Sequence, residues 1–388
     1  MKTAKVFAAA LVAVVLIVPV RARAEMIPDT PGFSSAAQGA VVMEAQSGEV
    51  VFAKNAEKQL PMASTTKIMS ALITLEQPNL DDWFVVNAKA VQVEGSSMGL
   101  MPGDQVTLRG LAYGMLLPSG NDAANSAAVK ISGSVEKFVE LMNKRAKEIG
   151  LTRTHFVTPS GLPNQEHYST AYDMAKLARE ALKNPDFAEI CGSKTAQLEF
   201  GNPPYKRWLS NHNRLLRSYE GAMGVKTGFT KSAGRCLVSA ATRNGVTLIA
   251  VTLNCPDDWN AHKNMLDAAF ALYEQQPAKQ YLPQQITVPV TGGVKGEAAL
   301  QPVGEPQVTV KKEGGQPLRV EICKDPFLYA PVKAGQVVGQ VVVYSGEDII
   351  CEVPLVTAES VDLLHQYEEK KGLLEEFLDW LKQWTHKE

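Results

Sequence analysis

Alternating hydrophobic and polar positions predict β-strands at both ends of a long N-terminal region. The runs AVVMEA (40–45) and EVVFAKN (49–55) flank a glycine-containing turn, a pattern that predicts a β-hairpin. The runs GRCLVSAATR (234–243) and VTLIAVTL (246–253) flank Asn244-Gly245, a pair that strongly favours a tight hairpin turn. The segment GAMGVKTGFT precedes this second hairpin, so it is predicted to lie on, or at the end of, a neighbouring strand.

Between the two hairpins the spacing of apolar residues becomes helical. A helix that begins near Ser64 has its apolar residues on one side: Ile68, Met69, Leu72, Ile73 and Leu75. Further helices are predicted over 108–117, from Asp122, over 134–149, over 169–183 and over 264–273. Hairpins at the ends and helices between them predict an α+β fold, in which helices flank an antiparallel sheet and form a helical subdomain.

The pattern changes near Pro277. From Ile286 to Val356 the sequence is rich in valine, is punctuated by Pro and Gly and has no helical periodicity, which predicts a small all-β domain. From Ser360 apolar residues return at helical spacing with acidic residues opposite, which predicts an amphipathic helix. The expected organisation is therefore a mixed domain over 25–276, an all-β domain over 277–358 and a helix over 359–388.

Residues 1–24 have the pattern of a signal peptide. Lys2 and Lys5 precede the apolar run Phe7–Val18, and the tripeptide Ala22-Arg23-Ala24 fits a cleavage site between small residues. This run is shorter than the roughly 20 residues that span a bilayer, although an uncleaved membrane anchor is the alternative interpretation. We expect an exported protein at the outer face of the cell membrane or in the cell wall.

Charge and cysteine content exclude several classes of function. The 388 residues include 39 Lys and Arg against 41 Asp and Glu, a net charge of −2, which gives no electrostatic basis for binding nucleic acid. The five cysteines are widely spaced, so they do not suggest a disulfide framework. Neither a Cys-x-x-Cys pair nor a His-Glu-x-x-His motif occurs, and we therefore expect no metal and no cofactor.

Three short motifs carry the candidate chemistry. Ser64 to Lys67 (STTK) places a serine and a lysine one helical turn apart, Ser119 to Asn121 (SGN) follows where a helix breaks, and Lys226 to Gly228 (KTG) follows on the predicted strand. A lone Ser-x-x-Lys says little, because a second one at 134–137 lies in a helix and reads as part of its solvated face. The three motifs in this order and context indicate a serine enzyme that transfers acyl groups.

The chemistry of acyl transfer explains these residue types. Ser64 is the candidate nucleophile, and its hydroxyl needs a base to remove its proton. Lys67 serves as that base only when neutral, and both burial and the nearby cation Lys226 would lower its pKa. The positive potential of the helix N-terminus favours the developing oxyanion.

The residues around the motifs resemble the D-alanyl-D-alanine carboxypeptidase family of low-molecular-mass penicillin-binding proteins. The resemblance rests on PMASTTKIMSALITLE, GSSMGLMPGDQVTLRGLAYGMLLPSGNDAAN, LTRTHFVTPSGLPNQEHYSTAYDMAKLA and GVKTGFTKSAGRCLVSAA, and runs from Met26 to Phe270. It continues more weakly through APVKAGQVVGQVVVY. It implies a catalytic domain like that of β-lactamases and transpeptidases, removal of the terminal D-alanine from peptidoglycan stem pentapeptides, and covalent binding of β-lactam antibiotics.

The resemblance also implies a role for each motif residue. The backbone N–H groups of Ser64 and Phe229 would form the oxyanion hole. Ser119 would relay a proton to the leaving D-alanine, and the Asn121 amide would hold Lys67 and the substrate backbone.

The KTG motif would bind the end of the substrate. Lys226 and Thr227 would hold the terminal carboxylate, and Gly228 would let the substrate backbone approach the strand. Many family members place an arginine in the helix near residue 264, where it helps to hold this carboxylate. This chain has no arginine there, so either His262 or Lys263 takes its place, or neither does.

Two further residues have a functional and a plain interpretation. His212 either reaches the site or is a hydrogen-bonded structural histidine, and the second is favoured. Glu166 is interpreted as a solvated acid in a loop, and the sequence contains no clear Glu-x-x-x-Asn element of the kind that positions the deacylating water in class A β-lactamases.

Other functions are weighed against this one. A serine β-lactamase would share the acylation step, but the all-β domain and the missing water-positioning element argue against it. A non-catalytic penicillin sensor or wall-binding module would not need every catalytic residue, and an endopeptidase side activity is compatible with the same site. The predicted tail helix would lie on the membrane surface, or on the protein or a partner; its seven acids against four lysines oppose binding to anionic lipid.

Overall fold

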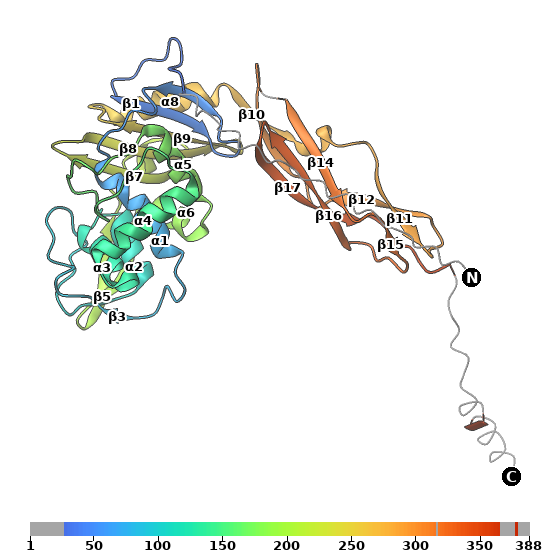
Figure 1. Cartoon of the computed structure of the whole chain (residues 1–388), viewed down its shortest axis with the longest axis horizontal. Coiled ribbons are helices and arrows are strands. Elements are labelled where there is room, and N and C mark those ends of the chain that lie inside the picture. Colours follow the sequence, from blue (N-terminus) through green and yellow to red (C-terminus); the bar gives the residue numbers. More distant parts are fainter. Residues whose placement is uncertain (1–26, 316, 365–376, 379–388) are drawn as a thin grey trace, which may run out of the picture.

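The hairpins predicted at the two ends of the mixed domain pair in one antiparallel sheet. A computed structural model describes residues 27–315, 317–364, 377 and 378, and its first sheet has the strand order β2-β1-β9-β8-β7 (Figure 1). The strands are β1 (Gly39–Glu44), β2 (Val50–Lys54), β7 (Ala222–Thr230), β8 (Gly234–Arg243) and β9 (Val246–Leu253). Asn244 and Gly245 connect β8 to β9 with positive φ angles of 49° and 81°, as the predicted tight turn requires.

Helices cover both faces of this sheet. Successive residues of a strand point to opposite faces, and Val41 and Val42 of β1 accordingly enter two different hydrophobic cores. One core contains helix α8, and the other contains the remaining long helices. The helices are α1 (Lys67–Leu75), α2 (Leu108–Leu116), α3 (Asn121–Ser132), α4 (Val135–Ile149), α5 (Ala171–Leu182), α6 (Pro185–Gly192), the short α7 (Leu215–Ser218) and α8 (Asp258–Phe270).

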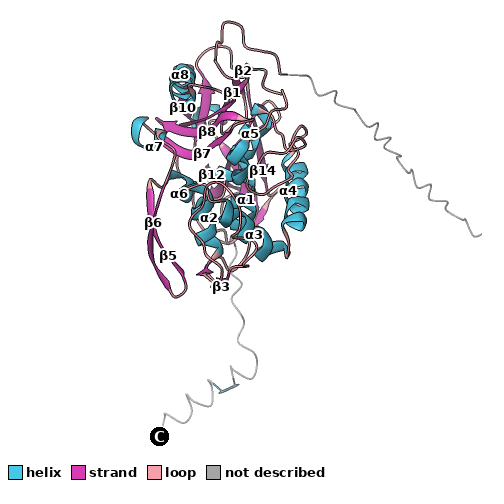
Figure 2. Ribbon diagram, turned by 90° about the vertical axis from the view of Figure 1, so that its left-hand side faces the viewer, coloured by secondary structure: helices cyan, strands magenta, loops and turns pink. Residues whose placement is uncertain are grey.

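Two boundaries in this domain differ from the prediction. Helix α8 begins at Asp258 rather than 264, and Tyr273 belongs to strand β10 (Tyr273–Pro277) rather than to the helix. A second sheet, which was not predicted, has the order β3-β4-β5-β6. Its strands are β3 (Phe84–Val85), β4 (Gln105–Val106), β5 (Thr195–Gly201) and β6 (Pro204–Ser210). The hairpin of β5 and β6 runs along one side of the molecule (Figure 2).

The second Ser-x-x-Lys sequence caps a helix. The hydroxyl oxygen of Ser134 accepts a hydrogen bond from the backbone N–H of Lys137 at 3.2 Å, at the N-terminus of α4. The same helix ends at Gly150, whose φ of 78° is typical of a C-terminal glycine. Ser134 therefore has a structural role that is separate from the other motifs.

The C-terminal domain is all-β, as predicted. A six-stranded sheet has the order β14-β16-β17-β12-β11-β15, and β13 pairs with β10 at the junction with the first domain. Apart from one 3₁₀ helix (Ala278–Tyr281), the described elements are β11 (Ile286–Thr291), β12 (Glu297–Pro302), β13 (Gln307–Lys311), β14 (Leu318–Lys324), β15 (Leu328–Tyr329), β16 (Val337–Ser345) and β17 (Asp348–Thr357). The domain stands beside the first one and has a separate core (Figure 1).

The predicted tail helix does not begin at residue 359. Val361 forms an isolated β-bridge with Val332, and Leu363 forms one with Gly293, so the chain is still extended and attached to the all-β domain there. Phe377 and Leu378 are helical, but the rest of the predicted helix lies outside the described residues, as does the predicted signal peptide. Within the described ranges, every helix falls short of the length and hydrophobicity that crossing a bilayer requires.

Candidate active site

Ser64 lies in a tight turn that leads into α1. The turn is a 3₁₀ helix (Ala63–Thr66), and Ala63 has a φ of 48°, a left-handed conformation that costs a non-glycine residue roughly 1–2 kcal/mol. Side-chain hydrogen bonds compensate for this strain. The hydroxyl of Thr65 donates to the carbonyl of Met62 at 2.6 Å, and that of Thr66 donates to the carbonyl of Ala63 at 2.8 Å. The candidate nucleophile is therefore held on a fixed backbone.

Lys67 contacts the Ser64 hydroxyl from a buried position. Its Nζ lies 3.0 Å from Ser64 Oγ, 2.7 Å from Asn121 Oδ1 and 2.8 Å from the carbonyl oxygen of Ser160, and the residue has no exposed surface. Burial lowers the pKa of Lys67 well below its ordinary value, and the positive charge of Lys226 lowers this pKa further, whereas Asp122 opposes the shift. This geometry is compatible with a neutral amine that donates to the two carbonyl oxygens and accepts from Ser64 Oγ, and the lowered pKa favours that neutral form.

The SGN motif lies where α2 gives way to α3. Ser119 has a φ of 64°, and the Asn121 side-chain amide donates to the carbonyl of Glu94 at 2.6 Å, so its Oδ1 is turned to Lys67. Asp122 accepts hydrogen bonds from the hydroxyl of Ser97 at 2.6 Å and from the backbone N–H groups of residues 98–100. This carboxylate thus attaches the loop around residue 97 to the start of α3.

The KTG motif lies on β7, the edge strand of the first sheet. Lys226 is buried, which lowers its pKa to about 7, and its Nζ donates to the carbonyl of Thr227 at 2.8 Å. A Cβ atom on Gly228 would lie only 3.0 Å from the Met62 carbonyl and 3.1 Å from the Ser64 backbone nitrogen. Glycine therefore lets β7 approach the turn that holds Ser64 (the nucleophile turn, Ala63–Thr66) closely. This contact within the protein is a second reason for glycine at this position, beside the approach of the substrate backbone that was expected from the sequence.

The three motifs meet at one cavity of about 320 Å³. Five residues predicted from the sequence line it: Ser64, Ser119, Thr227, Gly228 and Phe229. The other three, Lys67, Asn121 and Lys226, are buried, and Lys67 contacts both Ser64 and Asn121. His212, for which a structural role was favoured, also lines the cavity, and burial followed by the charge of Lys226 lowers its pKa.

Two arginines at this cavity were not predicted from the sequence. Arg235 of β8 pairs with Phe229 of β7, and Arg214 also lines the cavity. Arg235 Nε and Nη2 lie 3.0 and 2.5 Å from Oδ1 of Asp258, a carboxylate that is 2% exposed and therefore holds the guanidinium in place. The register of the β7–β8 hairpin is the signal that would have revealed Arg235, because it puts this residue beside the KTG motif.

Neither residue considered as a substitute for the helix arginine lines the cavity. The His262 ring is fully buried, with Nδ1 2.6 Å from Ser239 Oγ and Nε2 3.0 Å from Thr252 Oγ1, and burial lowers its pKa to about 3. Lys263 is also absent from the cavity lining. Glu166 is exposed, in agreement with its interpretation as a solvated acid.

Comparisons with known proteins identify the family. Residues 24–257 match the family model described as D-alanyl-D-alanine carboxypeptidase, and residues 283–363 match that of the penicillin-binding protein 5 C-terminal domain. The D-alanyl-D-alanine carboxypeptidase DacF of Bacillus subtilis is 36% identical over 335 residues, which cover 84% of this chain and 86% of the relative.

Solved structures give the same result. The DacD carboxypeptidase of Francisella tularensis has a TM-score of 0.61 and 27% identity, with 88% of this chain and 97% of that chain covered. A Streptomyces DD-transpeptidase has a TM-score of 0.59 and 34% identity, with 63% of this chain and all of that chain covered. With the motifs gathered at one cavity, these matches show that the chain belongs to the D-alanyl-D-alanine carboxypeptidase family.

Proposed function

We propose that this protein is a serine D-Ala-D-Ala carboxypeptidase that removes the terminal D-alanine from peptidoglycan stem pentapeptides. The observation that carries the proposal is the 3.0 Å contact between Ser64 Oγ and the buried amine of Lys67, whose pKa is lowered. Peptidoglycan lies outside the cytoplasmic membrane, which agrees with the signal peptide predicted from the sequence. All the residues assigned below lie within the proposed catalytic domain, 25–276.

Acylation begins at Ser64. Neutral Lys67 accepts the Ser64 hydroxyl proton while Oγ bonds to the carbonyl carbon of the penultimate D-alanine. The backbone N–H groups of Ser64 and Phe229 stabilise the oxyanion. Ser119 relays the proton that Lys67 has taken up to the leaving nitrogen, the C–N bond breaks, D-alanine departs, and Lys67 is neutral again. Water then hydrolyses the ester, which releases the shortened peptide and restores Ser64. In this scheme Asn121 positions Lys67.

The cationic end of the cavity selects a free C-terminus. Lys226 and Thr227 belong to the KTG motif, and Arg235 and Arg214 line the same cavity. Arginine binds a carboxylate through two parallel hydrogen bonds, and Asp258 fixes the orientation of Arg235. We assign to Arg235 the carboxylate-binding role that the sequence left open. This arrangement fits a substrate with a carboxylate next to the scissile bond, which the terminal D-alanine of a stem pentapeptide provides.

Replacing Arg235 with glutamine is therefore expected to remove much of the preference for a free C-terminus. The variant should cleave a D-Ala-D-Ala peptide about 10- to 100-fold less efficiently in kcat/KM, because a charge-assisted hydrogen bond contributes about 1.5–3 kcal/mol. Cleavage of the C-terminal carboxamide should change little. Lys263→Gln removes a cation outside the cavity and serves as the control. Equal losses on the acid and the carboxamide would show that Arg235 is needed for structure rather than for carboxylate binding.

The same site is expected to bind β-lactams covalently. Among the described residues that line the cavity, Asp258 is the only acid, and it is paired with Arg235, so none of these residues offers a free carboxylate to activate a deacylating water. The opened β-lactam also keeps its leaving amine attached, where it hinders the water that resolves the peptide ester once D-alanine has departed. A long-lived acyl-enzyme is therefore expected, rather than the fast turnover of a β-lactamase. Intact mass after incubation with benzylpenicillin, together with an assay of released D-alanine, tests the function: one stable adduct and D-alanine release support it. Rapid hydrolysis of the antibiotic would favour the β-lactamase, and an adduct without D-alanine release would favour the non-catalytic sensor.

A further inference from the structure

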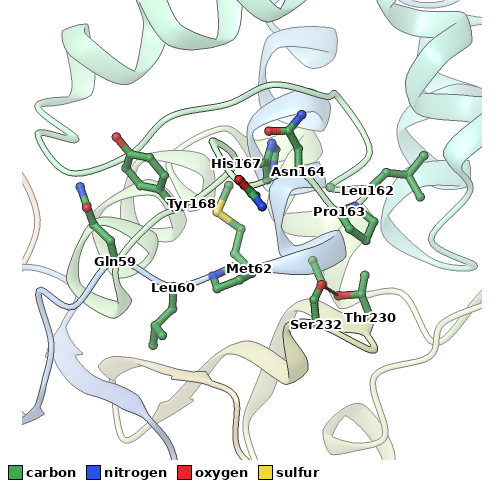
Figure 3. A pocket seen from close by; sticks show the side chains of 14 residues that line it. Gln59, Leu60, Met62, Leu162, Pro163, Asn164, His167, Tyr168, Thr230 and Ser232 are labelled. Carbon is green, nitrogen blue, oxygen red and sulfur yellow. Dashed lines mark hydrogen bonds between the residues drawn. The ribbon is translucent and has the colours of Figure 1, made fainter.

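A second and larger cavity lies on the other side of the nucleophile. It has a volume of about 590 Å³. Three segments line it: residues 59–63 before Ser64, the loop 161–168, and Thr230 and Ser232 at and after the end of β7 (Figure 3). Ala63 lines this cavity, whereas Ser64 lines the first one. Likewise, Thr230 lines this cavity, whereas Phe229 lines the first one. The two cavities therefore lie on either side of the nucleophile turn and of the end of β7.

A substrate bound as proposed above would lead into this second cavity. β7 is the edge strand of its sheet, so an extended peptide can add to it through backbone hydrogen bonds. With its C-terminus at Lys226 and Thr227, the peptide runs antiparallel to β7, and each residue advances by about 3.4 Å. The residue that precedes D-Ala-D-Ala then lies near Thr230, at the edge of the second cavity.

The loop that forms the far wall is attached to the nucleophile turn. The ring of His167 accepts a hydrogen bond at Nδ1 from the Val157 N–H, at 2.9 Å, so its Nε2 donates to Thr66 Oγ1, at 2.8 Å. Gly161, with a φ of 83°, comes so close that a Cβ atom would lie 2.0 Å from the Ala63 carbonyl oxygen. These contacts preform the cavity, and a preformed site does not have to be ordered when the substrate binds.

No charged side chain occurs among the described residues that line this cavity. Its polar groups are the amides of Gln59, Asn164 and Gln165, the Tyr168 phenol and two hydroxyls, beside apolar residues such as Leu162. Its one imidazole, His167, is neutral near pH 7, because burial lowers its pKa to about 4. Glu166 and Lys231 lie between lining residues in the sequence but do not line the cavity themselves. An ammonium group that entered it would lose water without gaining an ionic partner.

We propose that this cavity is the subsite for the stem-peptide residue that precedes D-Ala-D-Ala, and that it selects an uncharged side chain with a hydrogen-bonding tip over a free ammonium. The inference rests on the proposed function, because that function fixes where the C-terminus of the substrate lies. The side chain of this residue is thus selected on the acyl side of the scissile bond, whereas the cationic end of the first cavity binds the terminal D-alanine on the other side.

Two peptides that differ only in one charge test the subsite. In the first, Nε-acetyl-lysine precedes D-Ala-D-Ala, and in the second, lysine with a free ammonium does; both are acetylated at the N-terminus. The wild type should release D-alanine from the first with a kcat/KM about tenfold higher, as expected for a difference in binding of about 1.4 kcal/mol. Equal kcat/KM values, or a preference for the free ammonium, would overturn the proposal.

A single negative charge in the cavity should reverse this preference. Asn164 Oδ1 accepts a hydrogen bond from the Glu166 N–H at 2.8 Å, and Asn164→Asp keeps this acceptor while it adds a charge. Gln59→Glu adds a charge from another wall. The matched control is Asn87→Asp, because Asn87 Oδ1 accepts from the Lys89 N–H at 2.9 Å in a turn that does not line the cavity.

The ratio of the two kcat/KM values distinguishes the outcomes. Asn164→Asp and Gln59→Glu should shift it several-fold toward the free ammonium, and Asn87→Asp should leave it unchanged. A ratio that is the same in the wild type and all three variants would overturn the subsite but leave the carboxypeptidase function intact. Failure of the wild type to release D-alanine from either peptide would overturn the proposed function, and the subsite with it.

Discussion

Ser64→Ala is expected to abolish both β-lactam labelling and the release of D-alanine. The substitution removes the only hydroxyl that lies 3.0 Å from Lys67 Nζ, and no other serine in the described part of the chain contacts this amine through its side chain. Loss of the nucleophile of a serine hydrolase lowers kcat by about 10⁶-fold. The remaining activity would lie below what a D-alanine assay detects. Intact mass after incubation with benzylpenicillin should show no adduct.

The matched control for this experiment is Ser134→Ala, which changes the serine of the other Ser-x-x-Lys sequence. Ser134 caps helix α4, so its loss should lower the free energy of unfolding by about 1 kcal/mol without changing labelling. Thermal denaturation of both variants then separates folding from chemistry. An adduct on Ser64→Ala would mean that another residue is the nucleophile, whereas loss of labelling in Ser134→Ala would show that labelling depends on helix α4.

Local patterns predicted most of the mixed domain, because its elements carry their own signals. The β8–β9 hairpin has Asn-Gly at its turn, and α4 has a serine cap, an apolar face and a terminal glycine. The start of α8 was placed too late for a physical reason. Its buried apolar residues begin at Met265, whereas the first two turns bury the polar residues Asp258 and His262, which give no hydrophobic signal.

The missed hairpin of β5 and β6 has a similar explanation. Most of its residues are exposed or half-buried, and of its large apolar side chains only Phe200 and Leu209 are buried, so there is little alternation to detect. The tail boundary was wrong because Leu363 fits the helical pattern but makes a β-bridge to the all-β domain, as the neighbouring Val361 does. Such long-range pairing is not encoded in local periodicity.

The candidate site was predictable in its residues but not in its walls. The three motifs named the groups that meet around Ser64, because their residue types and order indicate the chemistry. Arg235 lacks such a signal, since the connection from Thr230 to Gly234 is not a two-residue turn and the register of the hairpin was unknown. The second cavity joins segments before Ser64, in the loop 161–168 and after β7, which only the folded chain brings together.

The pH dependence of acylation should identify Lys67 as the base. Only the neutral amine accepts the Ser64 proton, so the acylation rate should fall as the pH drops below the pKa of Lys67. Lys67→Met should lower this rate by about 10²- to 10⁴-fold, the usual contribution of a positioned base. Burial is the main cause of the lowered pKa and the charge of Lys226 is the second. Removing that charge should therefore raise the pKa of Lys67.

Lys226→Met is accordingly expected to move the acid limb of the pH profile of the acylation rate to higher pH. The maximal acylation rate should fall as well, because Lys226 also binds the carboxylate in the proposed mechanism. Arg214→Gln is the matched control: it removes a cation from the same cavity that is not among the causes of the Lys67 shift, so its acid limb should stay in place. Stopped-flow acylation by a fluorescent penicillin between about pH 5 and pH 11 gives all the profiles, a range that includes the ordinary lysine pKa near 10.4. If the limb of Lys226→Met coincides with that of the wild type, the group that titrates is not Lys67, because the loss of a neighbouring positive charge must raise the pKa of that amine.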